Sequence, residues 1–242
     1  MRPLLRTLLA TMVVALAIAA PSGAILNGKP DTAHPYVGIL VTVVDGQRVP
    51  VCSGFLVSPT VFVTAGHCVA ALGGTLPAYV SFDEAYTSGS VLLSGAAVPN
   101  PAFSVVGEHE IAAVILDEEV TDKGYAQLPS LGLLDSSVKK DALTVVGYGA
   151  NGFLKGGVPD FRFVRSFGDA RISKLEKDGF NLRMSSGICV GDSGGPVLLG
   201  SSHVVVGINS SVNNRKCAGN AFAFRLDTAE SLDFLASLPA DL

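Results

Sequence analysis

The chain has 242 residues, of which 48% are hydrophobic and 16% are charged, so it can bury a sizeable core and lacks the composition of a disordered protein. Its net charge is −4 and no run of lysine or arginine follows the first few residues, which argues against nucleic acid or an acidic lipid surface as a partner. The length fits one large all-β domain or two small ones, and no linker divides the chain.

The first 24 residues have the pattern of a signal peptide. Arg2 and Arg6 precede the apolar stretch from Leu8 to Ala20, and small residues follow at positions 21–24. This stretch is too short to cross a membrane comfortably, and no later stretch reaches about 20 apolar residues, so we expect no permanent membrane anchor. Removal of residues 1–24 takes the net charge from −4 to −6, and we expect residues 25–242 to be a secreted, extracellular monomer.

After this leader, short β-branched and aromatic runs alternate with Gly, Pro, Asn, Asp and Ser, a rhythm typical of an all-β protein. One terminal helix is expected to begin near Asp227, with Glu230 placed for a capping box and with Leu232, Leu235 and Leu238 able to face a core. The expected strands are residues 36–44, 52–57, 61–64, 91–98, 111–116, 143–147, 161–167, 197–199, 204–208 and 221–226.

The chain contains four cysteines: Cys52, Cys68, Cys189 and Cys217. Export to an oxidising compartment and an even number of cysteines together predict two disulfides, although the residues alone allow three pairings. A metal site is the rival interpretation. His67 beside Cys68 is a single adjacent pair without the usual spacing of zinc ligands, so we expect neither a metal nor another cofactor.

Three segments carry a catalytic pattern: Thr64-Ala65-Gly66-His67-Cys68, then Glu110 directly before the apolar run 111–116, then Gly191-Asp192-Ser193-Gly194-Gly195-Pro196. Their order, spacing and flanking cysteines resemble the landmarks of the trypsin/chymotrypsin serine endopeptidases across nearly all of residues 25–242. The resemblance implies two six-stranded antiparallel β-barrels with a short C-terminal helix. It also implies protein or peptide substrates and, as further partners, protein inhibitors.

By this resemblance Ser193 is the nucleophile, His67 the general base, and Glu110 the carboxylate that orients the imidazole. The amides of Gly191 and Ser193 are expected to bind the developing oxyanion. Glu110 departs from the family, which has aspartate at this position. Its extra methylene moves the carboxylate by roughly 1.5 Å, and a misplacement of about 1 Å can cost on the order of 10²-fold in rate.

The resemblance also implies the supports of the site. The expected disulfides are Cys52–Cys68 and Cys189–Cys217. The ammonium of Ile25, exposed when the leader is removed, is expected to pair with Asp192 and assemble the oxyanion loop. The expected substrate pocket comprises Gly187 as its floor, Ser210, Ser211 and Val212 along one wall, and Ala221 or Phe222 on the far wall.

Gly187 stands where enzymes that cleave after Lys or Arg carry aspartate, and Val212 stands where glycine usually leaves the pocket open. We therefore expect cleavage after small apolar residues. Two alternatives remain at this point. A catalytically silent member of the fold would act as a secreted binding or inhibitory protein, and an esterase-like hydrolase would use the same serine on other substrates.

Overall fold

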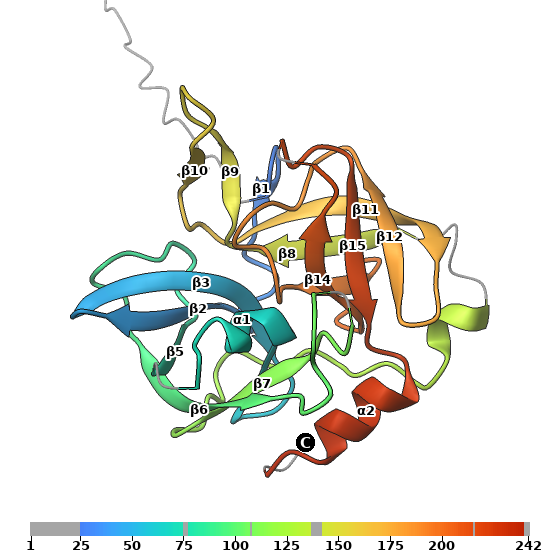
Figure 1. Cartoon of the computed structure of the whole chain (residues 1–242), viewed down its shortest axis with the longest axis horizontal. Helices are drawn as coiled ribbons and strands as arrows, with labels where there is room; N and C mark the ends of the chain where they lie inside the picture. Colours follow the sequence, from blue (N-terminus) through green and yellow to red (C-terminus); the bar gives the residue numbers. More distant parts are fainter. Residues whose placement is uncertain (1–24, 75–76, 107, 137–141, 215, 240–242) are drawn as a thin grey trace, which may run out of the picture.

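A computed structural model of the chain describes residues 25–74, 77–106, 108–136, 142–214 and 216–239. The predicted signal peptide lies outside these ranges. Two antiparallel β-barrels stand side by side, with the C-terminal helix packed beneath them (Figure 1). The prediction of two six-stranded barrels and a short terminal helix is therefore confirmed.

The first barrel closes in the order β2-β3-β4-β7-β6-β5. Asp45 and Gly46 connect β2 to β3 with φ angles of 50° and 76°, the left-handed conformations that a tight two-residue hairpin requires. Its interior is apolar and is centred on residues such as Leu40, Phe55 and Phe62, each with no exposed surface. The strands are β2 (Val37–Val44), β3 (Gln47–Leu56), β4 (Val61–Thr64), β5 (Ala78–Ser81), β6 (Leu93–Pro99) and β7 (Ala112–Leu116).

The second barrel closes because β8 pairs with both β13 and β11, and β1 adds to the outer edge of β11. A separate hairpin of β9 and β10 projects beside it (Figure 1). The strands are β1 (Lys29–Pro30), β8 (Leu143–Gly147), β9 (Ala150–Phe153), β10 (Pro159–Phe161), β11 (Ser166–Leu175), β12 (Gly179–Met184), β13 (Pro196–Leu199), β14 (Val205–Val212) and β15 (Asn220–Arg225).

The strands expected at 61–64 and 143–147 coincide with β4 and β8. The expectation of one strand over 161–167 is wrong, because β10 ends at Phe161 and β11 begins only at Ser166. The sequence pattern also failed to predict β5, β9, β12 and most of β11. Residues on β11 alternate between buried and exposed, with Asp169 and Arg171 on the outer face, so the strand contains no continuous apolar run.

Two α-helices and one short 3-10 helix, η1 (Leu133–Ser136), complete the described elements. The terminal helix α2 (Ala229–Ala236) begins two residues later than expected. Thr228 is its N-cap, and the Thr228 hydroxyl accepts from the Ser231 amide, so the predicted capping box with Glu230 is wrong. Leu235 and Leu238 are buried as expected, whereas Leu232 is only partly buried.

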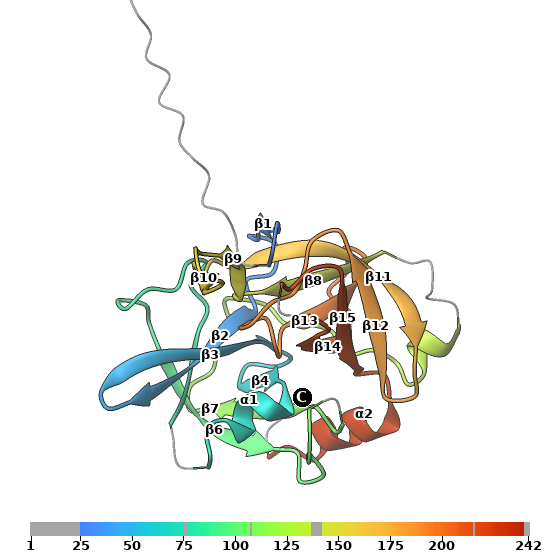
Figure 2. The same cartoon turned by 45° about the horizontal axis from the view of Figure 1, so that its top comes forward.

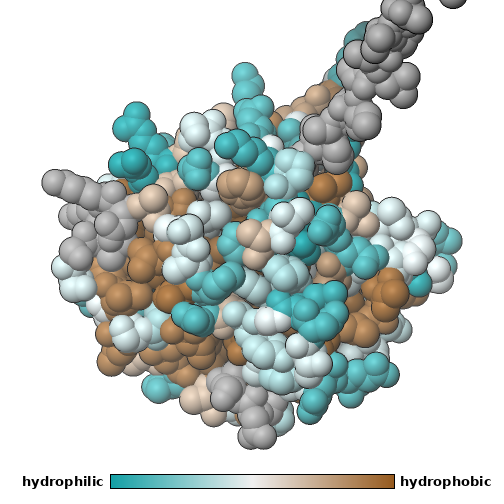
Figure 3. Space-filling model, turned by 180° about the vertical axis from the view of Figure 1, so that it is seen from behind, coloured by the Kyte–Doolittle hydropathy of each residue, from teal (hydrophilic) through white to brown (hydrophobic). Residues whose placement is uncertain are grey.

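The five-residue helix α1 (Gly66–Ala70) lies at the side of the first barrel that faces β14 of the second (Figure 2). Seen from behind, hydrophilic residues are interspersed with hydrophobic ones over much of the surface (Figure 3). Among the described residues, no helix combines the length and apolar character needed to span a bilayer.

Candidate active site

A cavity of about 300 Å³ opens where the two barrels meet. The first barrel contributes His67 from α1 and part of β3, and the second contributes the loop before β13 and the end of β14. The structure thus brings His67 and Ser193 to one cavity although 126 positions separate them in the sequence. The lining residues are Val51, Cys52, His67, Cys68, Ala71, Ile188, Cys189, Val190, Gly191, Ser193, Ser210, Ser211 and Val212.

The Glu110 carboxylate has no exposed surface and holds His67 at two points. Its Oε1 lies 2.7 Å from His67 Nδ1 and also accepts the His67 backbone N–H at 2.8 Å. A carboxylate at Nδ1 favours the tautomer that carries its proton there, which leaves Nε2 free to accept a proton. The Glu side chain therefore reaches the imidazole with hydrogen-bond geometry despite its extra methylene.

The backbone around Glu110 bends sharply. Ile111 N–H donates to the His109 carbonyl at 2.9 Å, which makes Glu110 the centre of a three-residue turn directly before β7. His109 adopts a left-handed φ of 51°, and its Nδ1 lies 2.5 Å from Glu230 Oε1 on α2. The bend and this contact locate the Glu110 backbone so that its longer side chain meets His67.

Ser193 is partly exposed at the cavity, and its hydroxyl donates to the Ser210 carbonyl at 3.3 Å. The Ser210 hydroxyl lies 3.4 Å from Glu110 Oε2, at the far limit of a hydrogen bond. Ser210 thus contacts both the expected nucleophile and the expected triad carboxylate. These contacts occur because β14 runs along the second barrel into the cavity.

The loop before β13 presents free amides beside Ser193. Gly191 has a φ of +95°, and a Cβ there would lie 2.9 Å from Gly149 Cα, so only glycine fits without strain. Among the described residues, the amides of Gly191 and Ser193 have no hydrogen-bond acceptor. Two unpaired amides beside a serine hydroxyl have the composition of an oxyanion-binding site.

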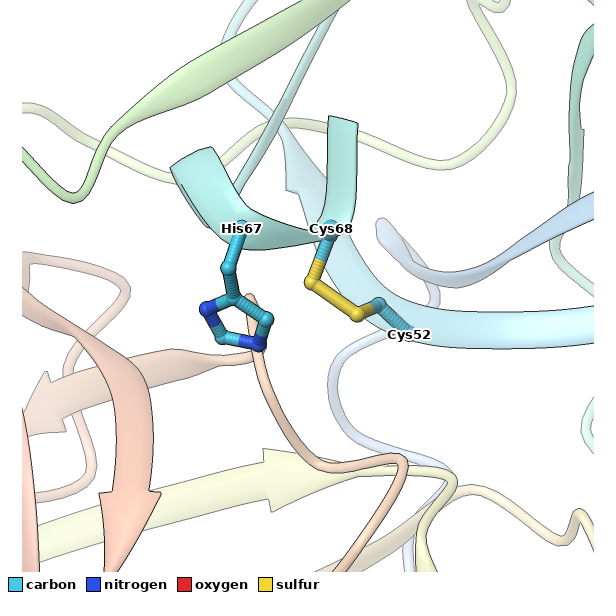
Figure 4. Close-up of side chains that lie close together, drawn as sticks. All are labelled: Cys52, His67 and Cys68. Carbon is cyan, nitrogen blue, oxygen red and sulfur yellow. A yellow bond between two sulfur atoms is a disulfide. The ribbon is translucent and has the colours of Figure 1, made fainter. Parts of the chain in front are cut away.

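Two disulfides brace the cavity from either side: Cys52–Cys68, which joins β3 to α1, and Cys189–Cys217 in the second barrel. This is the pairing that the family resemblance implied. Figure 4 shows the His67 ring and the Cys68 side chain projecting from α1, with the first disulfide beside the ring. Although Cys52, His67 and Cys68 place potential ligand atoms within 4.8 Å of one another, both sulfurs are used in the disulfide, so this cluster does not fit a metal ion.

The Asp192 carboxyl is fully buried. Burial raises its pKa to about 7, although the amides of Cys189 and Gly149 each donate to it at 2.8 Å and oppose the rise. Ile25 is also fully buried and packs in the core of the second barrel. Within the described part of the chain no cation pairs with Asp192, so the carboxyl lacks a balancing charge while Ile25 is still linked to Ala24.

The expected pocket residues divide into two groups. Ser210, Ser211 and Val212 line the cavity. Gly187 does not, because it is buried against the Cys217 carbonyl and exchanges backbone hydrogen bonds with Leu26.

The two candidates for the far wall also lie elsewhere. Ala221 belongs to the core of the second barrel, and the Phe222 ring packs over Gly179 of β12. The structure therefore brings neither residue to the cavity.

Several apolar residues that the sequence did not predict line the cavity. Ile188 is almost fully buried at the cavity, and Val190 is 57% exposed beside it. Both flank Cys189, and their closeness to Ser193 in the sequence is the signal that could have identified them. Val51 and Ala71 contribute from the first barrel, so the cavity is apolar on several sides.

Comparison with known proteins agrees with this architecture. The family profile described as Trypsin matches residues 25–233, and the chain therefore belongs to the trypsin family of serine proteases. Among solved structures, HL collagenase is 21% identical and superposes with a TM-score of 0.71, covering 87% of this chain and 96% of that one. At this identity the likeness shows the shared fold alone. The search of curated proteins found no match.

Proposed function

We propose that the chain is a secreted serine endopeptidase in which Ser193, His67 and Glu110 form a variant catalytic triad. Ser193 Oγ attacks the carbonyl carbon of the scissile peptide bond while His67 Nε2 takes the hydroxyl proton. His67 then gives that proton to the leaving amine as the carbon–nitrogen bond breaks. Water hydrolyses the resulting ester between Ser193 and the substrate by the same steps in reverse order and restores the serine.

One observation carries this proposal: the buried Glu110 carboxylate contacts His67 Nδ1 at 2.7 Å. A silent homologue would have no need for a buried carboxylate at this nitrogen, because burial of a charge is costly unless it is paired. The contact fixes the ring and stabilises the imidazolium that forms when Ser193 loses its proton. It supports a working role for Glu110 in place of the family's aspartate.

The free amides of Gly191 and Ser193 support the second part of the mechanism, stabilisation of the oxyanion. Removing one such donor costs about 10² to 10³ in rate in related chemistry. Asp192 adjoins this loop, and we propose that its carboxylate pairs with the Ile25 ammonium once residues 1–24 have been removed. Burial raises the pKa of Asp192 to about 7 and so disfavours its charged form. An ammonium beside the carboxyl would oppose this effect and favour the charged carboxylate.

The apolar cavity supports a preference for small apolar residues before the scissile bond. Ile188, Val190 and Val212 line it, and none of its lining residues carries a carboxylate that could pair with Lys or Arg. Gly187, Ala221 and Phe222 lie outside the lining. The proposed preference therefore rests on Ile188, Val190 and Val212.

Kinetics on peptide and ester substrates test the proposed function. Wild type, with Ile25 at its N-terminus, should hydrolyse a peptide substrate at least about 10³-fold faster than Ser193→Ala, because removal of a triad member leaves only the oxyanion site and binding. His67→Ala should lose a similar factor. If wild type hydrolyses esters but no peptides, it is an esterase. If it is no faster than Ser193→Ala on either, the chain is a binding protein.

A further inference from the structure

Ser53 lies on β3 of the first barrel and has no exposed surface. Its backbone N–H donates to the Ser193 carbonyl at 2.8 Å, and its hydroxyl donates to the Gly191 carbonyl at 2.8 Å. The same hydroxyl accepts the Tyr148 backbone N–H at 2.9 Å. One residue of the first barrel therefore contacts the loop before β13 twice and the segment after β8 once.

These contacts constrain the orientation of the loop. The Gly191 and Ser193 carbonyls belong to the peptide planes before and after the plane that carries the Ser193 N–H. Since a peptide unit is planar and its C=O and N–H point in opposite directions, holding both carbonyls toward Ser53 limits the rotation of the plane between them. The Ser193 amide lies in this middle plane and has no acceptor among the described residues, so it can point at the cavity while the carbonyls on either side of it are held. The Gly191 amide lies in the preceding plane, whose Val190 carbonyl accepts the Ala150 N–H at 2.9 Å.

The hydroxyl of Ser53 has a specific part in this arrangement, because it provides one donor and one acceptor at the same point. Alanine would leave the buried Tyr148 N–H without its acceptor and the Gly191 carbonyl without its donor. The Ser53 backbone is itself held, since the Thr64 hydroxyl donates to its carbonyl at 2.8 Å. A rigid strand of the first barrel therefore supports a loop of the second.

We propose that Ser53 is a positioning residue for the oxyanion site, acting through the Gly191 and Ser193 peptides. This inference rests on the proposed function, because an oxyanion site has a role only in an enzyme. In this role the Ser53 hydroxyl stabilises the transition state indirectly, by keeping the Ser193 amide directed at the cavity, and does not touch the substrate.

Ser231 offers a matched control for Ser53→Ala. It too is a serine with no exposed surface, and its hydroxyl makes one donated bond, to the Arg225 carbonyl at 2.7 Å, and one accepted bond, from the Thr228 hydroxyl at 3.1 Å. It lies on α2, and no residue of α2 lines the active-site cavity. Loss of packing and hydrogen bonds alone should therefore affect Ser53→Ala and Ser231→Ala alike.

Kinetics give the first readout. Ser53→Ala should lower kcat by about 10- to 100-fold, part of the effect of deleting an oxyanion donor, with KM changed by less than about threefold. Ser231→Ala should leave both constants within about twofold of wild type. If wild type is active and Ser53→Ala keeps its kcat, the proposal is overturned.

Amide hydrogen exchange gives a second readout that needs no turnover. The amides of Asp192, Gly194 and Gly195 are hydrogen-bonded and report on the loop. Their exchange should accelerate by about tenfold or more in Ser53→Ala and remain unchanged in Ser231→Ala. If the protein hydrolyses no substrate but exchange is faster in Ser53→Ala alone, the positioning of the loop by Ser53 is supported and the proposed function is wrong. Equal exchange in the two variants would overturn the positioning role.

Discussion

Glu110→Asp separates a site built around glutamate from a site that merely tolerates it. The change shortens the side chain by one carbon–carbon bond, about 1.5 Å. If the backbone stays in place, the contact between the carboxylate and His67 Nδ1 lengthens from 2.7 Å to roughly 4 Å, beyond hydrogen-bond range. The carboxylate also loses the His67 backbone N–H, which it now accepts at 2.8 Å.

A displacement of this size should lower kcat/KM by about 10²-fold, which corresponds to about 2.7 kcal/mol of transition-state stabilisation. Glu110→Ala, which removes the carboxylate, should cost about 10³ to 10⁴. In Glu110→Asp the lost methylene should reduce the free energy of unfolding by about 1 kcal/mol, and each of the two lost hydrogen bonds to the buried carboxylate by about 1.5–3 kcal/mol. Unfolding in urea therefore has to show that the variant is folded under the conditions of the assay. Glu118→Asp, on an exposed residue after β7, is the matched control and should change neither quantity measurably.

The assay is kcat/KM on a peptide substrate for wild type and the three variants, with unfolding in urea measured in parallel. An increase in kcat/KM in Glu110→Asp would show that the site is built for aspartate and that glutamate is a defect. No change in Glu110→Ala would show that Glu110 does not orient His67 during catalysis. Either result would refute the reasoning from the 2.7 Å contact.

Other properties follow from the same site. A peptide library should be cut mainly after Ala, Val and similar small residues, with loose selection among them because one methylene contributes about 1–3 kcal/mol; predominant cleavage after arginine would contradict this. Mass spectrometry of the active secreted protein should find Ile25 at its N-terminus, and an active species that begins earlier, for example at Ala20 or Pro21, would exclude pairing of the Ile25 ammonium with Asp192. In a Ser193→Ala precursor that keeps residues 1–24, the free energy of unfolding should fall as pH rises from about 4 to 7, because the folded pKa of Asp192 is about 7 and the unfolded value is 3.8. This loss in the free energy of unfolding amounts to about 4 kcal/mol. Urea unfolding measured across this pH range should show the loss in the precursor and should not show it after Asp192→Asn. Identical pH profiles for the precursor with and without Asp192→Asn would contradict it.

The sequence was sufficient for the fold class and for the meeting of His67 and Ser193 at one cavity. Strands such as 61–64 and 143–147 are short runs rich in β-branched and other apolar residues, so local pattern alone located them. The segments around His67 and Ser193 were recognisable because their order, spacing and flanking cysteines together resemble those of the trypsin family, whereas either segment alone would have been a weak signal. The same pattern did not predict β11, because charged residues on its outer face interrupt the apolar run.

The sequence could not predict which other side chains line the cavity or how the site is held in place. Whether Gly187 or Ile188 faces the substrate depends on the local backbone path, and here Leu26 and Cys217 enclose Gly187. The hydrogen bond from the Ser53 hydroxyl to the Gly191 carbonyl joins residues 138 positions apart, and neither local sequence predicts it. The reach of Glu110 likewise depends on a bend in the backbone that the residue types alone do not specify.

The most direct test of the central claim is labelling of the full mature protein with a fluorophosphonate, which reacts only with an activated serine. We expect one label per molecule, located on Ser193 by peptide mass spectrometry, and labelling slowed by about 10³-fold or more in Glu110→Ala. Absence of labelling in wild type, or labelling of Glu110→Ala at the wild-type rate, would contradict the assignment of Ser193, His67 and Glu110 as a working triad.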